Sequence, residues 1–137
     1  MLKKLSESLS KLKANSVRVL SREPEAGGET IAQLIFSDGS KLEFVYWRII
    51  RDGKERVSSF DHRQQYGLPT PIDAIKELQK ELQDKTITEA HFDKETGDLL
   101  LQFTKDVKLQ IFAFSGYEVW EIIFSDGTGE WSNYAKD

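Results

Sequence analysis

The sequence predicts an α+β fold in which an antiparallel sheet is covered by two helices. Two segments, at 2–12 and 72–82, have apolar residues at helical spacing. Each is followed by short stretches in which apolar and polar residues alternate, separated by turn residues. The same order of segments occurs twice along the chain. We therefore expect two helix-plus-antiparallel-meander repeats, with each helix covering sheet.

The first helix is expected to present Leu2, Leu5, Leu9 and Leu12 on one face. Asn15 can end it, because asparagine tolerates the left-handed conformation of a helix C-cap. An exposed loop over 21–29 and a Ser-Asp-Gly-Ser turn at 37–40 separate the strands that follow. Those strands are predicted at 17–20, 30–36, 41–50 and 56–60.

The second helix has clearer start signals, with Thr70 as N-cap, Pro71 as its first residue and Asp73 in the first turn. Its buried stripe is expected to be Ile72, Ile75, Leu78 and Leu82. Strands are then predicted at 86–92, 98–103, 108–114, 118–124 and 130–134. Alternation along the strands predicts a core that includes Leu34, Phe36, Leu42, Phe44, Leu99, Leu101, Phe103, Leu109, Ile111, Trp120, Ile122 and Phe124.

The two halves of the chain correspond in sequence. Residues 33–44 match residues 100–111, since each has Leu-x-Phe, a polar turn and then Lys-Leu-polar-apolar. Trp47-Arg48-Ile49-Ile50 matches Trp120-Glu121-Ile122-Ile123. We expect one domain over 1–137 with an internal duplication, the halves being about 1–67 and 68–137. If the halves pack about a pseudo-twofold axis, Arg48 and Glu121 could form an ion pair.

Composition excludes several classes of function. The chain has 137 residues, no Cys and only two His, which excludes disulfides and thiolate zinc sites and leaves little for a His-based metal site. Neither a membrane-spanning run nor a secretory signal is visible. We expect a soluble cytoplasmic protein with no cofactor, no metal and no membrane partner.

Charge is uneven along the chain. Residues 86–137 carry ten acidic and four basic residues, which disfavours nucleic acid and suits a basic protein partner. Aromatic residues lie among these acids and could supply contact area. The partner-binding residues predicted on this basis are Tyr117, Glu118, Glu121, Asp126, Glu130, Trp131 and Tyr134.

No catalytic motif is recognised. Asp61-His62-Arg63 is the one place where an acid, an imidazole and a guanidinium are adjacent, and it leaves an enzyme open as an alternative. Adjacent residues on an extended segment point to opposite faces, so an anchoring role for this loop is favoured. We predict no catalytic residues.

Several short motifs resemble a loose group of small bacterial proteins of unknown or immunity-type function. They are Tyr46-Trp47-Arg48-Ile49, Ser58-Ser59-Phe60-Asp61-His62 followed by Gly67 and Pro69, Thr96-Gly97-Asp98-Leu99 with Phe103 and Leu109, and Tyr117-Glu118-Val119-Trp120-Glu121-Ile122. The resemblance covers most of residues 30–127. It implies a non-enzymatic cytosolic protein, some members of the group being antidotes that bind a toxin domain.

Two functions are therefore expected. The first is a protein-binding module, an immunity protein that neutralises a toxin domain by occluding its active surface. The alternative is a self-associating structural or adaptor domain, including a homodimer, that pairs through strand edges or the Leu-rich helix.

Overall fold

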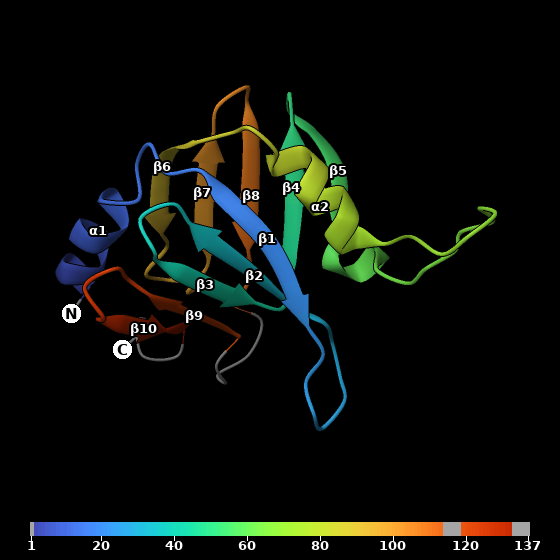
Figure 1. Ribbon diagram of the computed structural model, residues 1–137, viewed down its shortest axis with the longest axis horizontal. Helices are drawn as coiled ribbons and strands as arrows, with labels where there is room; N and C mark the ends of the chain where they lie inside the picture. Colours follow the sequence, from blue (N-terminus) through green and yellow to red (C-terminus); the bar gives the residue numbers. More distant parts are fainter. Residues whose placement is uncertain (1, 114–118, 133–137) are drawn as a thin grey trace.

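The chain forms a mostly-β structure with two short helices, described by a computed structural model over residues 2–113 and 119–132 (Figure 1). The helices are α1 (Leu2–Ser10) and α2 (Ala74–Leu82), and a 3₁₀ turn, η1, covers Ser59–Asp61. The strands of the first half are β1 (Val17–Arg22), β2 (Ile31–Phe36), β3 (Lys41–Phe44), β4 (Trp47–Arg51) and β5 (Lys54–Ser58). Those of the second half are β6 (Ile87–Phe92), β7 (Leu99–Phe103), β8 (Val107–Ile111), β9 (Trp120–Ile123) and β10 (Gly129–Trp131).

The strands make two antiparallel sheets of five strands each. The first sheet has the order β1-β2-β3-β9-β10, and the second has the order β5-β4-β8-β7-β6. Each sheet therefore combines three successive strands from one half of the chain with a hairpin from the other half. Strand β3 pairs with β9, and β4 pairs with β8.

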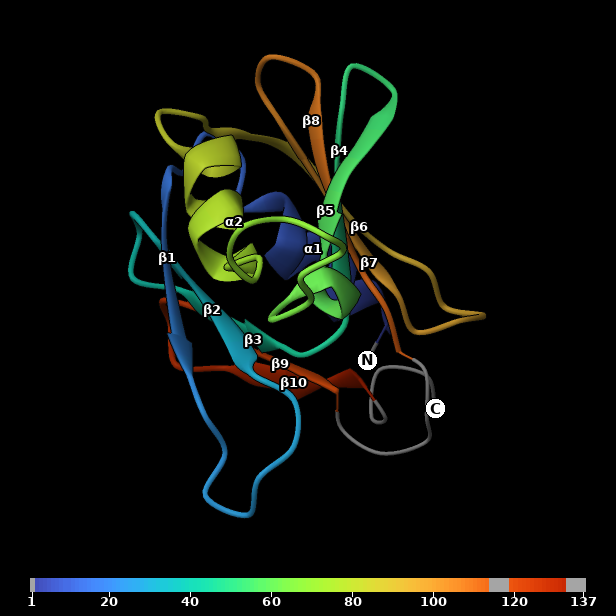
Figure 2. The same cartoon turned by 90° about the vertical axis from the view of Figure 1, so that its right-hand side faces the viewer.

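Both helices lie between the two sheets (Figure 2). Helix α2 packs against β1 of the first sheet and β5 of the second, and α1 packs against β6. The side chains of Leu5, Leu9, Leu78 and Leu82 are almost fully buried there. The core forms between the sheets, so the opposite face of each sheet is left without a helix among the described residues.

The predicted antiparallel strands and two helices are confirmed, but the strands divide into two sheets where the prediction has one. The predicted strand at 41–50 is wrong in this respect, because it breaks at Val45 and Tyr46 into β3 and β4. Leu42 and Phe44 point inward before the break, and Trp47 and Ile49 after it. The buried positions thus change from even-numbered to odd-numbered residues where the chain crosses from the first sheet to the second.

The predicted end of the first helix and the predicted start of the second both need correction. Asn15 does not adopt the left-handed conformation; Ala14 does, with a φ of 73°. The buried Asn15 side chain instead donates to the carbonyl of Leu12 at 3.0 Å. At the start of α2 the N-cap is Asp73, whose carboxylate accepts from the backbone N–H of Lys76, and helix begins after it rather than at Pro71.

Candidate protein-binding face on the first sheet

The outer face of the first sheet brings together two of the predicted site residues. Strand register aligns one row across all five strands, running Leu20, Gln33, Glu43, Glu121, Trp131. Directly opposed residues in antiparallel strands share a face, with Cβ atoms roughly 4.5–5.5 Å apart. The carboxylates of Glu43 and Glu121 are therefore neighbours on the side of the sheet that faces away from the helices.

Glu43 is held by groups of its own sheet. Arg22 Nε lies 3.0 Å from its Oε2 and Lys41 Nζ lies 3.9 Å away, and the Gln33 amide also donates to it. Partial burial acts to raise the pKa of Glu43, but these hydrogen bonds and the charges of Arg22 and Lys41 outweigh it, so the pKa lies below its ordinary value. Glu43 is thus kept ionised by the sheet itself.

Glu121 is held differently. Its Oε2 accepts a 2.6 Å hydrogen bond from the indole Nε1–H of Trp131. Among the described residues no cationic group lies within 4.0 Å of this carboxylate. Like charges placed opposite one another on neighbouring strands are destabilising. The nearest cations both lie within 4.0 Å of Glu43, and the charge of Arg22 acts on Glu121 from a longer distance. Glu121 therefore carries a charge that its own sheet leaves without an ion pair.

A small cavity of about 160 Å³ lies beside these side chains. Arg22, Glu43, Glu121 and Trp131 contribute to its lining, together with apolar residues such as Val119. Drug-sized ligands occupy pockets of roughly 300–1,000 Å³, so this cavity has the scale of a single side chain.

The same face carries apolar side chains in contact with solvent. Leu20 on β1 and Ile123 on β9 are each 42% exposed, and Ile31, Ile35 and Trp131 are half-buried. An antiparallel sheet with one face on the core usually has polar residues on the other. The outer face of the first sheet departs from this pattern.

The predicted site residues do not all meet. Glu121 and Trp131 lie together, whereas Glu130 is in register with the buried Ile122 and so points to the other side of β10. Asp126 lies in the turn before β10, where its Oδ1 accepts from the N–H and hydroxyl of Thr128. Tyr117, Glu118 and Tyr134 lie outside the described residues.

The face is also less acidic than the sequence suggested. Arg22 and Lys41 lie on it, and Arg18 projects from β1 on the same side. These basic residues come from the first half of the chain, so the charge of residues 86–137 alone does not describe the surface. Sequence reasoning missed Glu43 and Arg22 because only the pairing of β3 with β9 brings them to Glu121.

The Arg48–Glu121 ion pair expected from the repeat is wrong. Arg48 lies on the second sheet, where its Nε donates to Gln110 at 2.8 Å, it lies 3.8 Å from Glu55, and its guanidinium stacks over Phe112. The two equivalent residues are in different sheets and each is engaged locally.

The Asp61-His62-Arg63 segment forms separate contacts. Asp61 accepts from Ser58 and Tyr66, and His62 Nδ1 accepts from the backbone N–H of Ala74 at the start of α2. Arg63 pairs with Glu23 at 2.7 Å. This arrangement anchors the segment between β5 and α2, as the sequence favoured.

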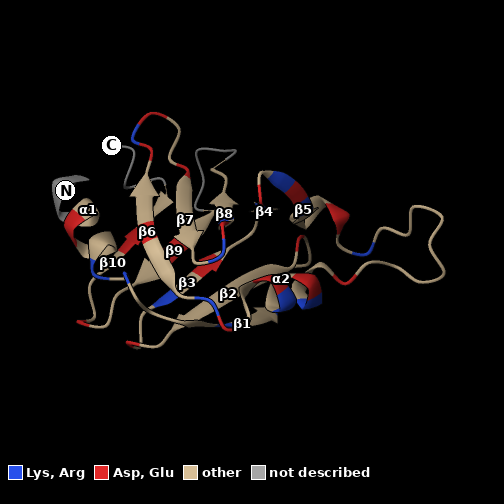
Figure 3. Cartoon of the chain, turned by 90° about the horizontal axis from the view of Figure 1, so that it is seen from above, with Lys and Arg blue, Asp and Glu red and all other residues tan. Residues whose placement is uncertain are grey.

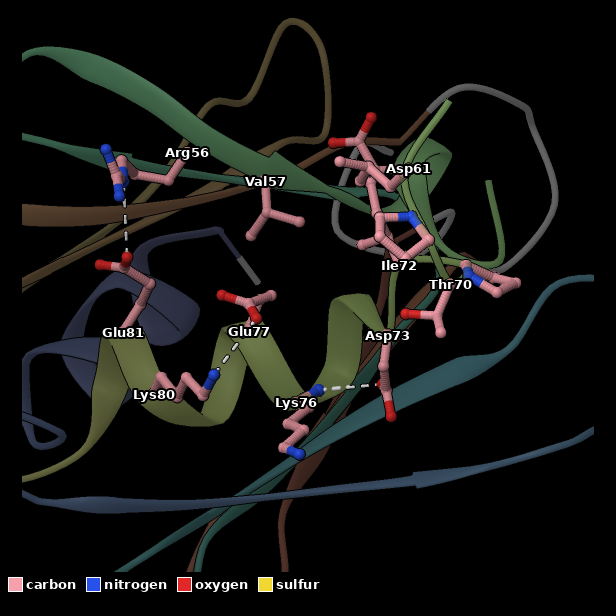
Figure 4. A pocket seen from close by; sticks show the side chains of 13 residues that line it. Arg56, Val57, Asp61, Thr70, Ile72, Asp73, Lys76, Glu77, Lys80 and Glu81 are labelled. Carbon is pink, nitrogen blue, oxygen red and sulfur yellow. Dashed lines mark hydrogen bonds and ion pairs between the residues drawn. The ribbon is translucent and has the colours of Figure 1, made fainter. Parts of the chain in front are cut away.

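A second and larger cavity, of about 560 Å³, lies between β5, α2 and the segment that joins them (Figure 4). Acidic and basic residues are mixed along α2 and β5 (Figure 3). Glu81 lies between Arg51 and Arg56, and Glu77 lies 3.5 Å from Lys80. Glu81 thus connects α2 with the β4–β5 hairpin, whereas Glu77 and the N-cap Asp73 are engaged within α2 itself, so these carboxylates have structural roles.

Comparison of the chain with family models, with curated proteins and with solved structures gives no match. The resemblance to immunity-type proteins therefore stays a prediction. Within residues 2–113 and 119–132 no helix has the length and apolar character needed to span a membrane. The same residues contain no cluster of three or more His, Asp or Glu side chains suited to a metal ion.

Proposed function

We propose that the chain is a non-enzymatic protein-binding module whose partner docks on the outer face of the first sheet. The observation that carries the proposal is the exposure of Leu20 and Ile123 on a face that also holds Glu121 and Trp131. Apolar anchors and a tryptophan surrounded by charged groups are the composition of a protein interface.

The partner in this proposal is a basic polypeptide, and the biological role is that of a cytoplasmic antidote that occludes the active surface of a toxin domain. The charge of Glu121, which has no ion pair among the described residues, and the resemblance of several motifs to immunity-type proteins support this choice. Blocking a surface requires tight association and no chemistry. This agrees with the hydrogen bonds by which Asp61 and His62 hold the backbone at Ser58 and Ala74.

The alternative of self-association through strand edges has less support. The Gln79 side chain donates to the carbonyl of Val19, on β1 at an edge of the first sheet. At one edge of the second sheet, β5 begins with Lys54, Glu55 and Arg56, and charged residues discourage edge-to-edge pairing.

The internal duplication also belongs to this proposal. A helix, a three-strand meander and a hairpin occur in each half, about 1–67 and 68–137, and the hairpins β4–β5 and β9–β10 occupy corresponding places in opposite sheets. Because each half contributes a hairpin to the sheet of the other half, the two halves belong to a single domain in this proposal.

The proposed function is tested by affinity capture from the native host, with the wild-type chain and two variants used as bait in parallel. Leu20→Thr/Ile123→Thr removes exposed apolar groups while keeping strand-forming residues. Leu68→Ser is the control, because Leu68 is 47% exposed but lies on the segment before α2. We expect the wild type and the control to recover one basic polypeptide in near-equal amount, and the double variant to lose it.

Equal recovery by all three proteins contradicts the proposed face. The recovered polypeptide is then expressed alone and together with the chain. Toxicity that co-expression suppresses supports the antidote role, and a harmless partner would leave only the binding function.

A further inference from the structure

The geometry points to an arginine side chain of the partner as the group that enters the cavity beside Glu43, Glu121 and Trp131. This inference rests on the proposed function and specifies the chemistry of its contact. The cavity, of about 160 Å³, has room for one side chain rather than for a small-molecule ligand of ordinary size.

Charge complementarity selects a cation. Of the two opposed carboxylates, Glu43 lies within 4.0 Å of both Arg22 and Lys41, whereas Glu121 has no described cationic group within that distance. The ionisable groups that line the cavity are Arg22, Glu43 and Glu121, and Lys41 lies 3.9 Å from Glu43 without lining it. The charge of Arg22 also acts on Glu121, but from beyond ion-pair distance. A second cation at Glu121 would relieve the repulsion between the carboxylates.

The shape of the site selects arginine over lysine. Both oxygens of Glu43 already accept from Arg22, so the incoming cation meets the carboxylate of Glu121. A planar, forked guanidinium can donate two hydrogen bonds there, and lysine offers only a compact point charge. The half-buried Trp131 stands beside Glu121, and arginine is the cation that most often stacks on tryptophan. Arg22 already shows this chemistry on Glu43, with Nε at 3.0 Å and Nη2 at 3.4 Å from its two oxygens.

The experiment titrates isotope-labelled protein with N-acetyl-arginine amide while the indole N–H resonance of Trp131 is followed by NMR. Because this N–H donates to Glu121, it reports directly on a cation that arrives there. N-acetyl-citrulline amide, which has the same shape without charge, and N-acetyl-lysine amide are titrated in parallel. We expect arginine amide to bind about tenfold more tightly than citrulline amide, and more tightly than lysine amide.

Two glutamate variants locate the contact. Glu121→Gln keeps an acceptor for Trp131 but removes the charge, and it should weaken arginine binding about tenfold. Glu130→Gln removes the same charge from the other side of β10 and should leave the binding constant unchanged. The methyl resonances of Val119, which also lines the cavity, provide a second readout and show that the variants are folded.

Equal binding of citrulline amide, equal binding of lysine amide, or full binding by Glu121→Gln would each overturn the inference. The proposed function is tested separately by capture. Loss of the partner in the Leu20/Ile123 variant without any arginine effect would overturn the arginine contact alone. Arginine binding without a captured partner would overturn the protein-binding function.

Discussion

The indole Nε1–H of Trp120 donates a 2.8 Å hydrogen bond to the carbonyl oxygen of Gly97. Trp120 is on β9 of the first sheet, and Gly97 is in the turn between β6 and β7 of the second. Both residues are buried, and the ring of Phe92 on β6 meets Trp120 edge to face at 6.1 Å. This bond connects the two sheets on the inner side of β9.

Trp120→Phe should lower the free energy of unfolding by about 1–3 kcal/mol, because it leaves the buried carbonyl of Gly97 without its donor. Denaturant unfolding followed by circular dichroism measures the loss. Trp131→Phe serves as the matched control, since its indole bonds to Glu121 on the outer face. A larger loss in the control than in Trp120→Phe would contradict this role.

Asn15 joins the end of α1 to the turn between β2 and β3. Its Oδ1 accepts from the Ser37 hydroxyl and the Asp38 N–H, each at 2.7 Å, and its Nδ2 donates to Leu12. Asn15→Ala should cost about 1–3 kcal/mol of unfolding free energy, because the buried bond to Leu12 and two partly buried bonds to the turn are lost. Asn15→Asp keeps the acceptor oxygens and should cost less; an equal cost would show that the acceptors do not matter.

The ionisation of Glu43 should make stability depend on pH at the acidic end. Its pKa is lowered in the folded state, so its contribution is complete above the unfolded value of about 4.3 and is lost as pH falls through the folded pKa. Glu43→Gln should therefore be less stable than the wild type at pH 7, and the difference should shrink below about pH 4. Urea unfolding across pH 3–7 tests this, and a constant difference would contradict it.

Tyr66 should respond at the alkaline end. Tyr66 is 66% exposed, and a slight desolvation, the hydrogen bond to Asp61 and the Asp61 charge together raise the pKa of the phenol. The contact therefore persists up to the unfolded pKa of about 10 and is lost as pH rises through the folded value. Ultraviolet titration of Asp61→Asn should show one tyrosine ionising at lower pH than in the wild type, and identical curves would count against the contact.

Neither half of the chain should fold alone. A fragment of residues 1–67 leaves β4 and β5 without β8, and a fragment of 68–137 leaves β9 and β10 without β3. Circular dichroism should show each fragment largely unfolded and their equimolar mixture regaining sheet. Cooperative unfolding of either isolated fragment would contradict the dependence of one half on the other.

The sequence by itself determined the local elements and much of the core. Spacing placed Leu5, Leu9, Leu78 and Leu82 on buried helix faces, and alternation placed residues such as Leu34 and Leu101 inside. It also separated Trp120, which is buried, from Glu121, which points outward. These features follow from the periods of helix and strand, which act over a few residues.

Only the tertiary structure decided which strands share a sheet and which charges meet. Alternation tells which way a side chain points, but it does not say which distant strand lies alongside. The crossing at Val45 and Tyr46 sends β4 to the second sheet, and β9 takes the place beside β3. That pairing alone brings Glu43 to Glu121, because the packing of both sheets around the helices, and no local pattern, selects the partner of each edge.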